Sequence, residues 1–226
     1  MLLTSRKPIV INKLKWYNWF PTAEKKMNET RQKIVDVATR LFSLYGFLRT
    51  TVDEVAKNLR VSKKTIYQYF RSKDELVEAV FDSITDPAFA TINEIIDSQL
   101  SFAESISAIF NVLQGVFLQV TPAMFYDLQN SPSLWEKIDA KRRRVISRYG
   151  ELIERGQKDG DIRTDIDSKF MSNFVAYLVR HLATPQIIIE LGINPADMAN
   201  KFLSIFLTGI LTAKGREKIV GDKDEN

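Results

Sequence analysis

The chain of 226 residues has no cysteine and only one histidine. The lack of cysteine excludes disulfides and thiolate metal sites, and one imidazole is too few for a histidine-based zinc site. The chain also lacks a phosphate-binding loop, a glycine-rich dinucleotide fingerprint and a catalytic triad pattern around His181. We therefore expect a cytoplasmic protein that is not an enzyme and has no metal and no cofactor.

Glycine and proline are scarce, with nine and seven residues, while 45% of the residues are hydrophobic. This composition, with long apolar periodicity, suits an all-α globule with a substantial core. The longest apolar stretch, residues 202–213, is interrupted by Ser204, Thr208 and Thr212 and is shorter than the roughly 18 residues of a membrane span. We expect no membrane segment and no signal peptide.

Positive charge is concentrated near the N-terminus. Residues 1–28 carry a net charge of +5 and residues 29–80 a net charge of +3, whereas residues 81–226 carry −4. An acidic body is poorly suited to contact DNA, whereas a basic N-terminal region is suited to meet phosphate. The extension 1–28 is basic and aromatic without a sustained period, so it either reaches DNA or is a dispensable, weakly ordered tail.

The central motif is the stretch 51–70. Thr51 and Glu54 have the spacing of a capping box, and Ser62 is a second N-cap residue at the start of a short helix over 63–69. The first helix carries one apolar stripe, formed by Val52, Val55, Ala56 and Leu59. Two short helices joined by a tight turn, with a basic start to the second, indicate a helix-turn-helix.

In such a motif the second helix enters the major groove, where long polar side chains reach base edges. Packed amphipathic helices without any DNA role show the same pattern, so the motif alone leaves both interpretations open. The candidates for base edges are Lys63, Lys64, Thr65 and Gln68. The candidates for phosphate contacts are Thr50, Thr51, Tyr67, Tyr69 and Lys73.

The flanking residues strongly favour the DNA-binding interpretation. From Thr30 to Phe81 the chain closely resembles the DNA-binding domain of TetR-family transcriptional regulators. The matching features are Ala38, Leu41, Phe42 and Gly46, the run Thr50-Thr51-Val52, Val55-Ala56, Val61-Ser62, Tyr67-x-Tyr69-Phe70 and Ser72-Lys73-x-Glu75-Leu76. The resemblance implies a helix-turn-helix domain over 29–75 and a helical effector-binding and dimerisation domain over 76–214. The charged residues at the end of the chain indicate a tail over 215–226.

Local signals predict the helix bounds. The first helix is expected from Glu29 to Tyr45 with Gly46 as its stop, and a capping box of Ser72 and Glu75 starts a helix that ends at Asp86-Pro87. Proline and glycine positions then predict helices over 88–99, 102–120, 122–130, 132–156, 166–190 and 195–214. The basic run 141–144 is expected to be a solvated helix face.

The body is rich in aromatic residues, for which ordinary core packing is the alternative to an effector pocket. The resemblance implies an apolar pocket that binds a small apolar or aromatic effector. The expected lining is Phe110, Phe117, Tyr126, Trp135, Phe174, Tyr177 and His181.

The final helix is apolar around nearly its whole circumference, so it must be covered on all sides. A second subunit is the natural cover at this position, and the resemblance implies a four-helix dimer interface. The expected interface residues are Phe170, Phe174, Met198, Phe202, Ile205, Phe206 and Gly209.

Together these features predict a homodimeric repressor that binds a palindromic operator in double-stranded DNA and is released by its effector. An activator or a ligand-independent regulator of the same fold is an open alternative. A small-molecule carrier with a vestigial helix-turn-helix is a further one, although Lys63, Lys64, Tyr67 and Lys73 argue against it.

Overall fold

The computed structural model describes residues 29–182, 184–193 and 195–220. The expected N-terminal extension and residues 221–226 therefore lie outside the described residues. Within those ranges the regular elements are helices. The described residues also contain one isolated antiparallel β-bridge, between Ile162 and Leu211. The prediction of an all-α fold is confirmed.

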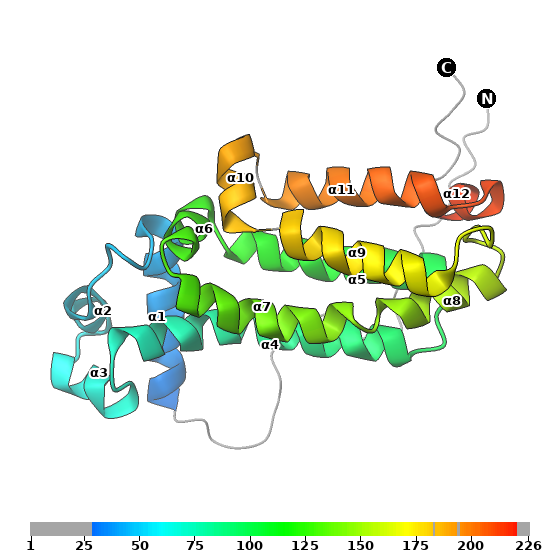
Figure 1. Cartoon of the computed structure of the whole chain (residues 1–226). Helices are drawn as coiled ribbons and strands as arrows, with labels where there is room; N and C mark the ends of the chain where they lie inside the picture. The colour runs from blue at the N-terminus through cyan, green and yellow to red at the C-terminus, as the bar shows by residue number, and fades with distance from the viewer. Residues whose placement is uncertain (1–28, 183, 194, 221–226) are drawn as a thin grey trace, which may run out of the picture.

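Three helices form the head at one end of the molecule (Figure 1), namely α1 (Glu29–Tyr45), α2 (Val52–Leu59) and α3 (Lys63–Tyr69). Gly46 ends α1 in the left-handed region, with φ of 80°. The Thr51 hydroxyl accepts from the Glu54 amide while the Glu54 carboxylate accepts from the Thr51 amide, which completes the predicted capping box. The Ser62 hydroxyl caps α3 in the same way.

The helix α4 (Lys73–Asp97) corrects the expectation that it ends at Asp86-Pro87. The helix continues through Pro87 because its buried face, from Leu76 to Ile96, packs along the body, and this burial outweighs the missing amide hydrogen bond. Only half of the expected capping box forms at its start. Ser72 accepts from the Glu75 amide, but the Glu75 carboxylate accepts from the Arg71 amide.

The body runs alongside α4, with the head at one end and α12 at the other (Figure 1). Its other helices are α5 (Phe102–Gln119), α6 (Pro122–Gln129), α7 (Pro132–Ile146), α8 (Tyr149–Lys158), α9 (Ser168–Leu182), α10 (Pro185–Leu191), α11 (Pro195–Ile210) and α12 (Ala213–Val220).

Two expected long helices are each broken in two. The stretch 132–156 breaks between α7 and α8 at Ser147 and Arg148, where no proline or glycine marks the break. The stretch 166–190 breaks because Thr184 caps a new helix whose first residue is Pro185. The single-helix predictions for both stretches were wrong.

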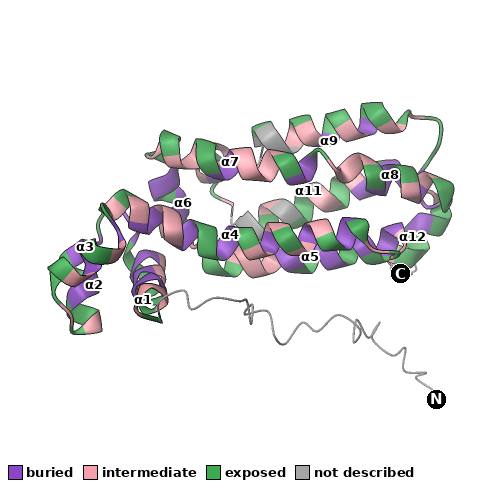
Figure 2. Cartoon of the chain, turned by 90° about the horizontal axis from the view of Figure 1, so that it is seen from below, coloured by how far each residue is buried: buried purple, intermediate pink, exposed green. Residues whose placement is uncertain are grey.

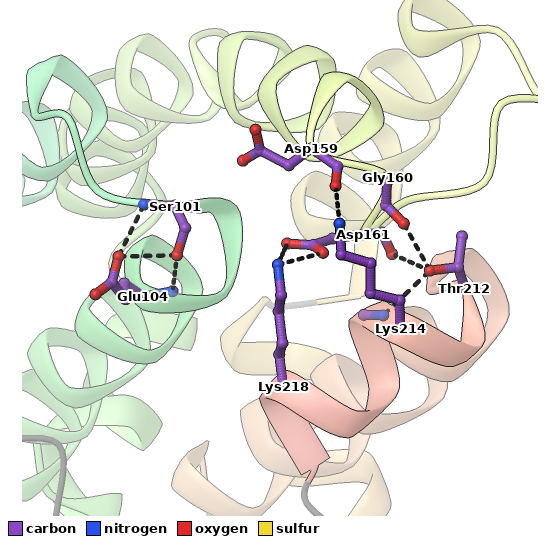
Figure 3. Close-up of polar contacts among 9 residues, drawn as sticks. Ser101, Glu104, Asp159, Gly160, Asp161, Thr212, Lys214 and Lys218 are labelled. Atoms are coloured by element: carbon purple, nitrogen blue, oxygen red, sulfur yellow. Dashed lines mark hydrogen bonds and ion pairs between the residues drawn. The ribbon is translucent and has the colours of Figure 1, made fainter.

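The expected charged tail begins with a packed helix. Helix α12 returns to the α8–α9 loop, where the Thr212 hydroxyl donates to the Gly160 carbonyl oxygen at 2.8 Å (Figure 3). Lys218 Nζ lies 2.7 Å and 2.9 Å from the two carboxylate oxygens of Asp161, a residue with no exposed surface. A Cβ atom at Gly215 would overlap the Asp161 carbonyl oxygen, so the glycine permits this close approach.

The buried residues, coloured purple in Figure 2, form two clusters. One cluster joins the head to the start of α4 and to α6, through residues such as Phe42, Phe81 and Met124. The other fills the far half of the body between α4, α5, α8 and α11. The first cluster crosses the expected boundary at residue 75, so the head and α6 share one core.

Ion pairs bind α4 to α7 and α8. Lys141 Nζ lies 2.8 Å from both Asp82 and Asp86, and Arg148 bonds Asp97 at 2.5 Å. The basic run 141–144 is therefore only partly a solvated face, because Lys141 joins two helices. Each exposed pair of this kind contributes little to the free energy of unfolding.

Among the described residues no single helix is long and apolar enough to cross a membrane. Helices α5 and α6 reach that length and composition only as a pair, which is bent by 83°. In the same part of the chain, no group of three or more histidine, aspartate or glutamate residues is arranged to hold a metal ion.

Candidate nucleic-acid interface and effector cavity

One side of helix α3 packs against the core of the head, and the other side is exposed to solvent. Ile66 and Phe70 are buried in the head core, each with 1% of its surface exposed. Because these two positions face inward, the opposite side of α3 is exposed. The exposed side chains of the helix are Lys63, Lys64, Tyr67 and Gln68.

The two lysines at the start of α3 differ in their surroundings. Lys63 Nζ lies 2.7 Å from Asp53 of α2, and this hydrogen bond raises the pKa of the lysine, so it stays charged. Lys64 is exposed and makes no hydrogen bond or ion pair with the part of the chain that the structure describes. The Thr65 hydroxyl bonds the Ser62 hydroxyl at 2.9 Å, which turns it toward the cap. Lys64 and Gln68 are thus the most accessible of the expected base-contacting residues.

The expected phosphate-contacting residues also separate by exposure. Thr51 and Tyr67 are exposed, and Tyr69 packs partly against the head core. Thr50 is 3% exposed and its hydroxyl donates to the Gly46 carbonyl oxygen at 2.7 Å. Its hydroxyl therefore does not reach the surface, which corrects the expectation for Thr50. Lys73 Nζ donates to the Leu48 carbonyl oxygen at 3.0 Å.

The body encloses an apolar cavity of about 260 Å³ between α4, α5, α7, α8 and α11. Three of the expected effector-pocket residues line it, namely Phe110, Phe117 and Trp135. The other four were wrong for this cavity, because their side chains are exposed outside it. Tyr126 is 58% exposed on α6, and Phe174, Tyr177 and His181 lie on the outer face of α9.

Sequence reasoning missed the two ionisable residues of the described cavity wall, Arg142 and Tyr149. Arg142 lies within the basic run 141–144, and its guanidinium stacks over the Trp135 ring at 5.0 Å. No local signal separates Arg142 from its basic neighbours. Its position depends on how α7 is rotated against α4.

A chain of contacts joins the cavity to the head. Phe125 and Leu128 of α6 line the cavity, while Asp127 on the same helix is 6% exposed. The Asp127 carboxylate accepts from the Leu48 amide in the α1–α2 loop at 2.7 Å. Because Lys73 of α4 holds the carbonyl oxygen of the same residue, helices α4 and α6 both hold the Leu48 backbone.

Comparison with known proteins identifies the family. A sequence profile of bacterial regulatory proteins of the tetR family matches residues 34–80. An HTH-type transcriptional regulator of Bacillus subtilis, YhgD, is 30% identical over 139 residues, which cover 60% of this chain and 73% of YhgD. The chain belongs to the TetR family. It is therefore a transcriptional regulator with its helix-turn-helix in the head.

Two further relatives extend the likeness of this TetR regulator to the body. The HTH-type transcriptional repressor KstR2 of Mycolicibacterium smegmatis is 21% identical over 64% of this chain and 73% of its own length. The structure of FadR from Bacillus subtilis in complex with stearoyl-CoA aligns with a TM-score of 0.55 and 20% identity, over 79% of this chain and 98% of FadR. The second likeness establishes a shared fold.

The outer face of this TetR regulator carries four of the seven expected dimer residues. Phe170, Phe174 and Ile205 are exposed by 62%, 46% and 76%, and the rings of Phe170 and Phe174 stack at 6.0 Å. Gly209 is exposed on α11, whereas Met198 and Phe206 line the cavity. The side chain of Phe202 lies outside the described residues.

Proposed function

We propose that the chain is a homodimeric repressor that binds a palindromic operator and is released when an apolar effector enters the body cavity. The observation that carries the proposal is the contact between α6 and the head. Helix α6 lines the cavity, and its Asp127 also accepts a hydrogen bond from the loop between α1 and α2. The head is taken as residues 29–75 and the body as 76–214.

On the operator, α3 of each subunit occupies a major groove, and the two copies are separated by about 34–36 Å. Lys64 and Gln68 extend from the exposed side of α3 toward base edges. Lys63 can also reach them when its ion pair with Asp53 is broken. Thr51 and Tyr67 contribute to phosphate contacts.

Dimerisation is supported by the apolar residues exposed on the outer face of α9 and on α11. Phe170, Phe174, Tyr177 and Ile205 are all more than two-fifths exposed in one subunit. Apolar exposure of this extent along two helices is typical of a subunit interface. A second copy of the chain covers it.

Release follows from the shared helices. A ligand that widens the cavity displaces α4 and α6, and these helices hold opposite sides of the Leu48 backbone, so the head moves with them. A 100-fold loss of operator affinity requires about 2.7 kcal/mol of differential ligand binding. Burial of about 110 Å² of apolar ligand surface in one state supplies that amount. The stearoyl-CoA bound to FadR and the repressor function of KstR2 agree with this scheme.

The test is fluorescence anisotropy with labelled DNA from upstream of the protein's own gene, in a salt series and against random DNA. We expect a strong preference for the specific DNA and a steep fall in affinity with salt, because phosphate contacts release counterions. Sedimentation of the same sample measures the subunit stoichiometry.

Lys64→Ala is expected to lower specific affinity at least tenfold, because the dimer presents the lost base contact twice. Lys158→Ala is the matched control, since it removes the same charge from an exposed position of α8. Equal losses in both variants, or no preference over random DNA, would contradict the assignment of α3 as the recognition helix.

A further inference from the structure

The cavity is elongated along α5. The residues of this helix and its cap that line it extend from Phe102 to Val120. Eighteen residue steps correspond to about 27 Å of helix at about 1.5 Å per residue. A ligand that fills such a space is long and narrow.

Few polar groups meet the ligand along this length. Arg142 and Tyr149 are the ionisable residues among the described lining, and Thr85 adds a hydroxyl. The Thr85 hydroxyl donates to the Phe81 carbonyl oxygen at 3.0 Å, within its own helix. Recognition of a polar ligand group therefore falls to Arg142 and Tyr149.

The charge of Arg142 is already neutralised. Its Nε donates to Asp139 Oδ1 at 2.9 Å, and Asp139 is 5% exposed. Arg143 also binds Asp139, and its second partner is Glu136, so two arginines face two carboxylates. Burial lowers the pKa of Arg142, which shows how strongly this wall disfavours charge. A buried ligand ion of either sign would lack a free counter-ion here.

The Tyr149 hydroxyl is available to a ligand. Burial raises the pKa of Tyr149 to about 12, so the phenol stays protonated and is a hydrogen-bond donor. The hydroxyl makes no hydrogen bond to the part of the chain that the structure describes. Tyr149 is partly buried and lines the cavity, so an acceptor oxygen on a ligand could pair with its hydroxyl.

We propose that the effector is a long, uncharged, lipid-like molecule whose carbonyl oxygen accepts a hydrogen bond from the Tyr149 hydroxyl beside Arg142. This inference rests on the proposed function, because it names the ligand class of the same cavity. The ligand must fill the apolar length of the cavity, and it must accept a hydrogen bond without carrying a charge. An ester or ketone with a long chain meets both conditions. A carboxylate or an ammonium group fails the second condition.

Isothermal titration with three ligands of equal chain length tests this inference, using methyl decanoate, decanoate and decylammonium. We expect methyl decanoate to bind at least tenfold more tightly than either ion. Tyr149→Phe is expected to weaken binding of the ester about three- to tenfold, because one hydrogen bond is lost. Tyr126→Phe removes a hydroxyl that lies outside the cavity and is expected to leave binding unchanged.

The infrared carbonyl stretch of the bound ester provides a readout that does not depend on any variant. We expect it at lower frequency than in an apolar solvent, as for a hydrogen-bonded carbonyl. Tighter binding of either ion, or an unshifted carbonyl band, would overturn the inference. Operator release by such an ion would still support the proposed function. Conversely, tight ester binding without operator release would refute ligand-controlled repression and leave the ligand class standing.

Discussion

Replacement of Gly46 by alanine is expected to destabilise the protein by about 2–5 kcal/mol. Gly46 has φ of 80°, and a side chain in this left-handed region costs about 1–2 kcal/mol. Its Cβ atom would also lie 2.5 Å from Asp127 Oδ2, an atom held in place by the Leu48 amide. Overpacking of this kind costs about 1–3 kcal/mol more. Chemical unfolding at one fixed protein concentration measures the loss.

The matched control for Gly46→Ala is Gly115→Ala, in the interior of α5. Apart from the neighbouring residues and backbone of α5 itself, no described atom lies within 4 Å of the added Cβ at Gly115, so this change is expected to be neutral or to stabilise by up to about 1 kcal/mol. In the double variant Gly46→Ala/Asp127→Ala, the Asp127 carboxylate that the new Cβ atom would contact is absent. Of the two costs of Gly46→Ala, only the backbone strain then remains. The loss in the double variant should therefore fall short of the sum of the two single losses by at least about 1 kcal/mol. Strict additivity would show that the α1–α6 contact is not the source of the strain.

The head was predictable because its signals are local. Thr51 with Glu54, Ser62 with Thr65 and Gly46 after Tyr45 each act within one helical turn, and each forms as the spacing indicates. The helix bounds over 29–69 follow directly from these caps. In the head, the helix bounds that the local capping signals favour are also the bounds that the packed fold adopts.

The body was predicted less well because long-range packing outweighs local signals. Pro87 reads as a helix stop, yet burial of residues such as Ile84 and Ile92 carries α4 through it. The α7–α8 break has no proline or glycine at Ser147 or Arg148 to announce it. These features depend on the neighbouring helices, which the local sequence does not specify.

The candidate site shows the same division. The exposed side of α3 follows from the Ser62 cap and two buried residues, so the exposure of Lys64 and Gln68 was predictable from the sequence. The cavity required the rotation of each body helix. Aromatic content found Phe110, Phe117 and Trp135 but also chose Tyr177, which faces outward, and it missed Tyr149.

The second large effect is expected at Lys218, in the segment that composition assigned to a charged tail. Its ammonium group is the hydrogen-bond partner of the Asp161 carboxylate, which has no exposed surface (Figure 3). Lys218→Met therefore leaves a buried carboxylate uncompensated, which is expected to cost about 3–5 kcal/mol. The loss should appear in thermal unfolding as a lowered midpoint, and in hydrogen exchange as faster exchange of α12.

Lys214 on the same helix provides the control for Lys218→Met. Its Nζ donates to the Asp159 carbonyl oxygen at 2.6 Å. Lys214→Met therefore removes an equal charge and one hydrogen bond, but it leaves no buried carboxylate without a partner. We expect a loss of no more than about 1 kcal/mol. Asp161→Asn/Lys218→Met should recover much of the loss, because the amide is uncharged and buries at lower cost. Equal losses at both lysines would mean that α12 is held by backbone contacts such as those of Thr212, and not by the buried ion pair.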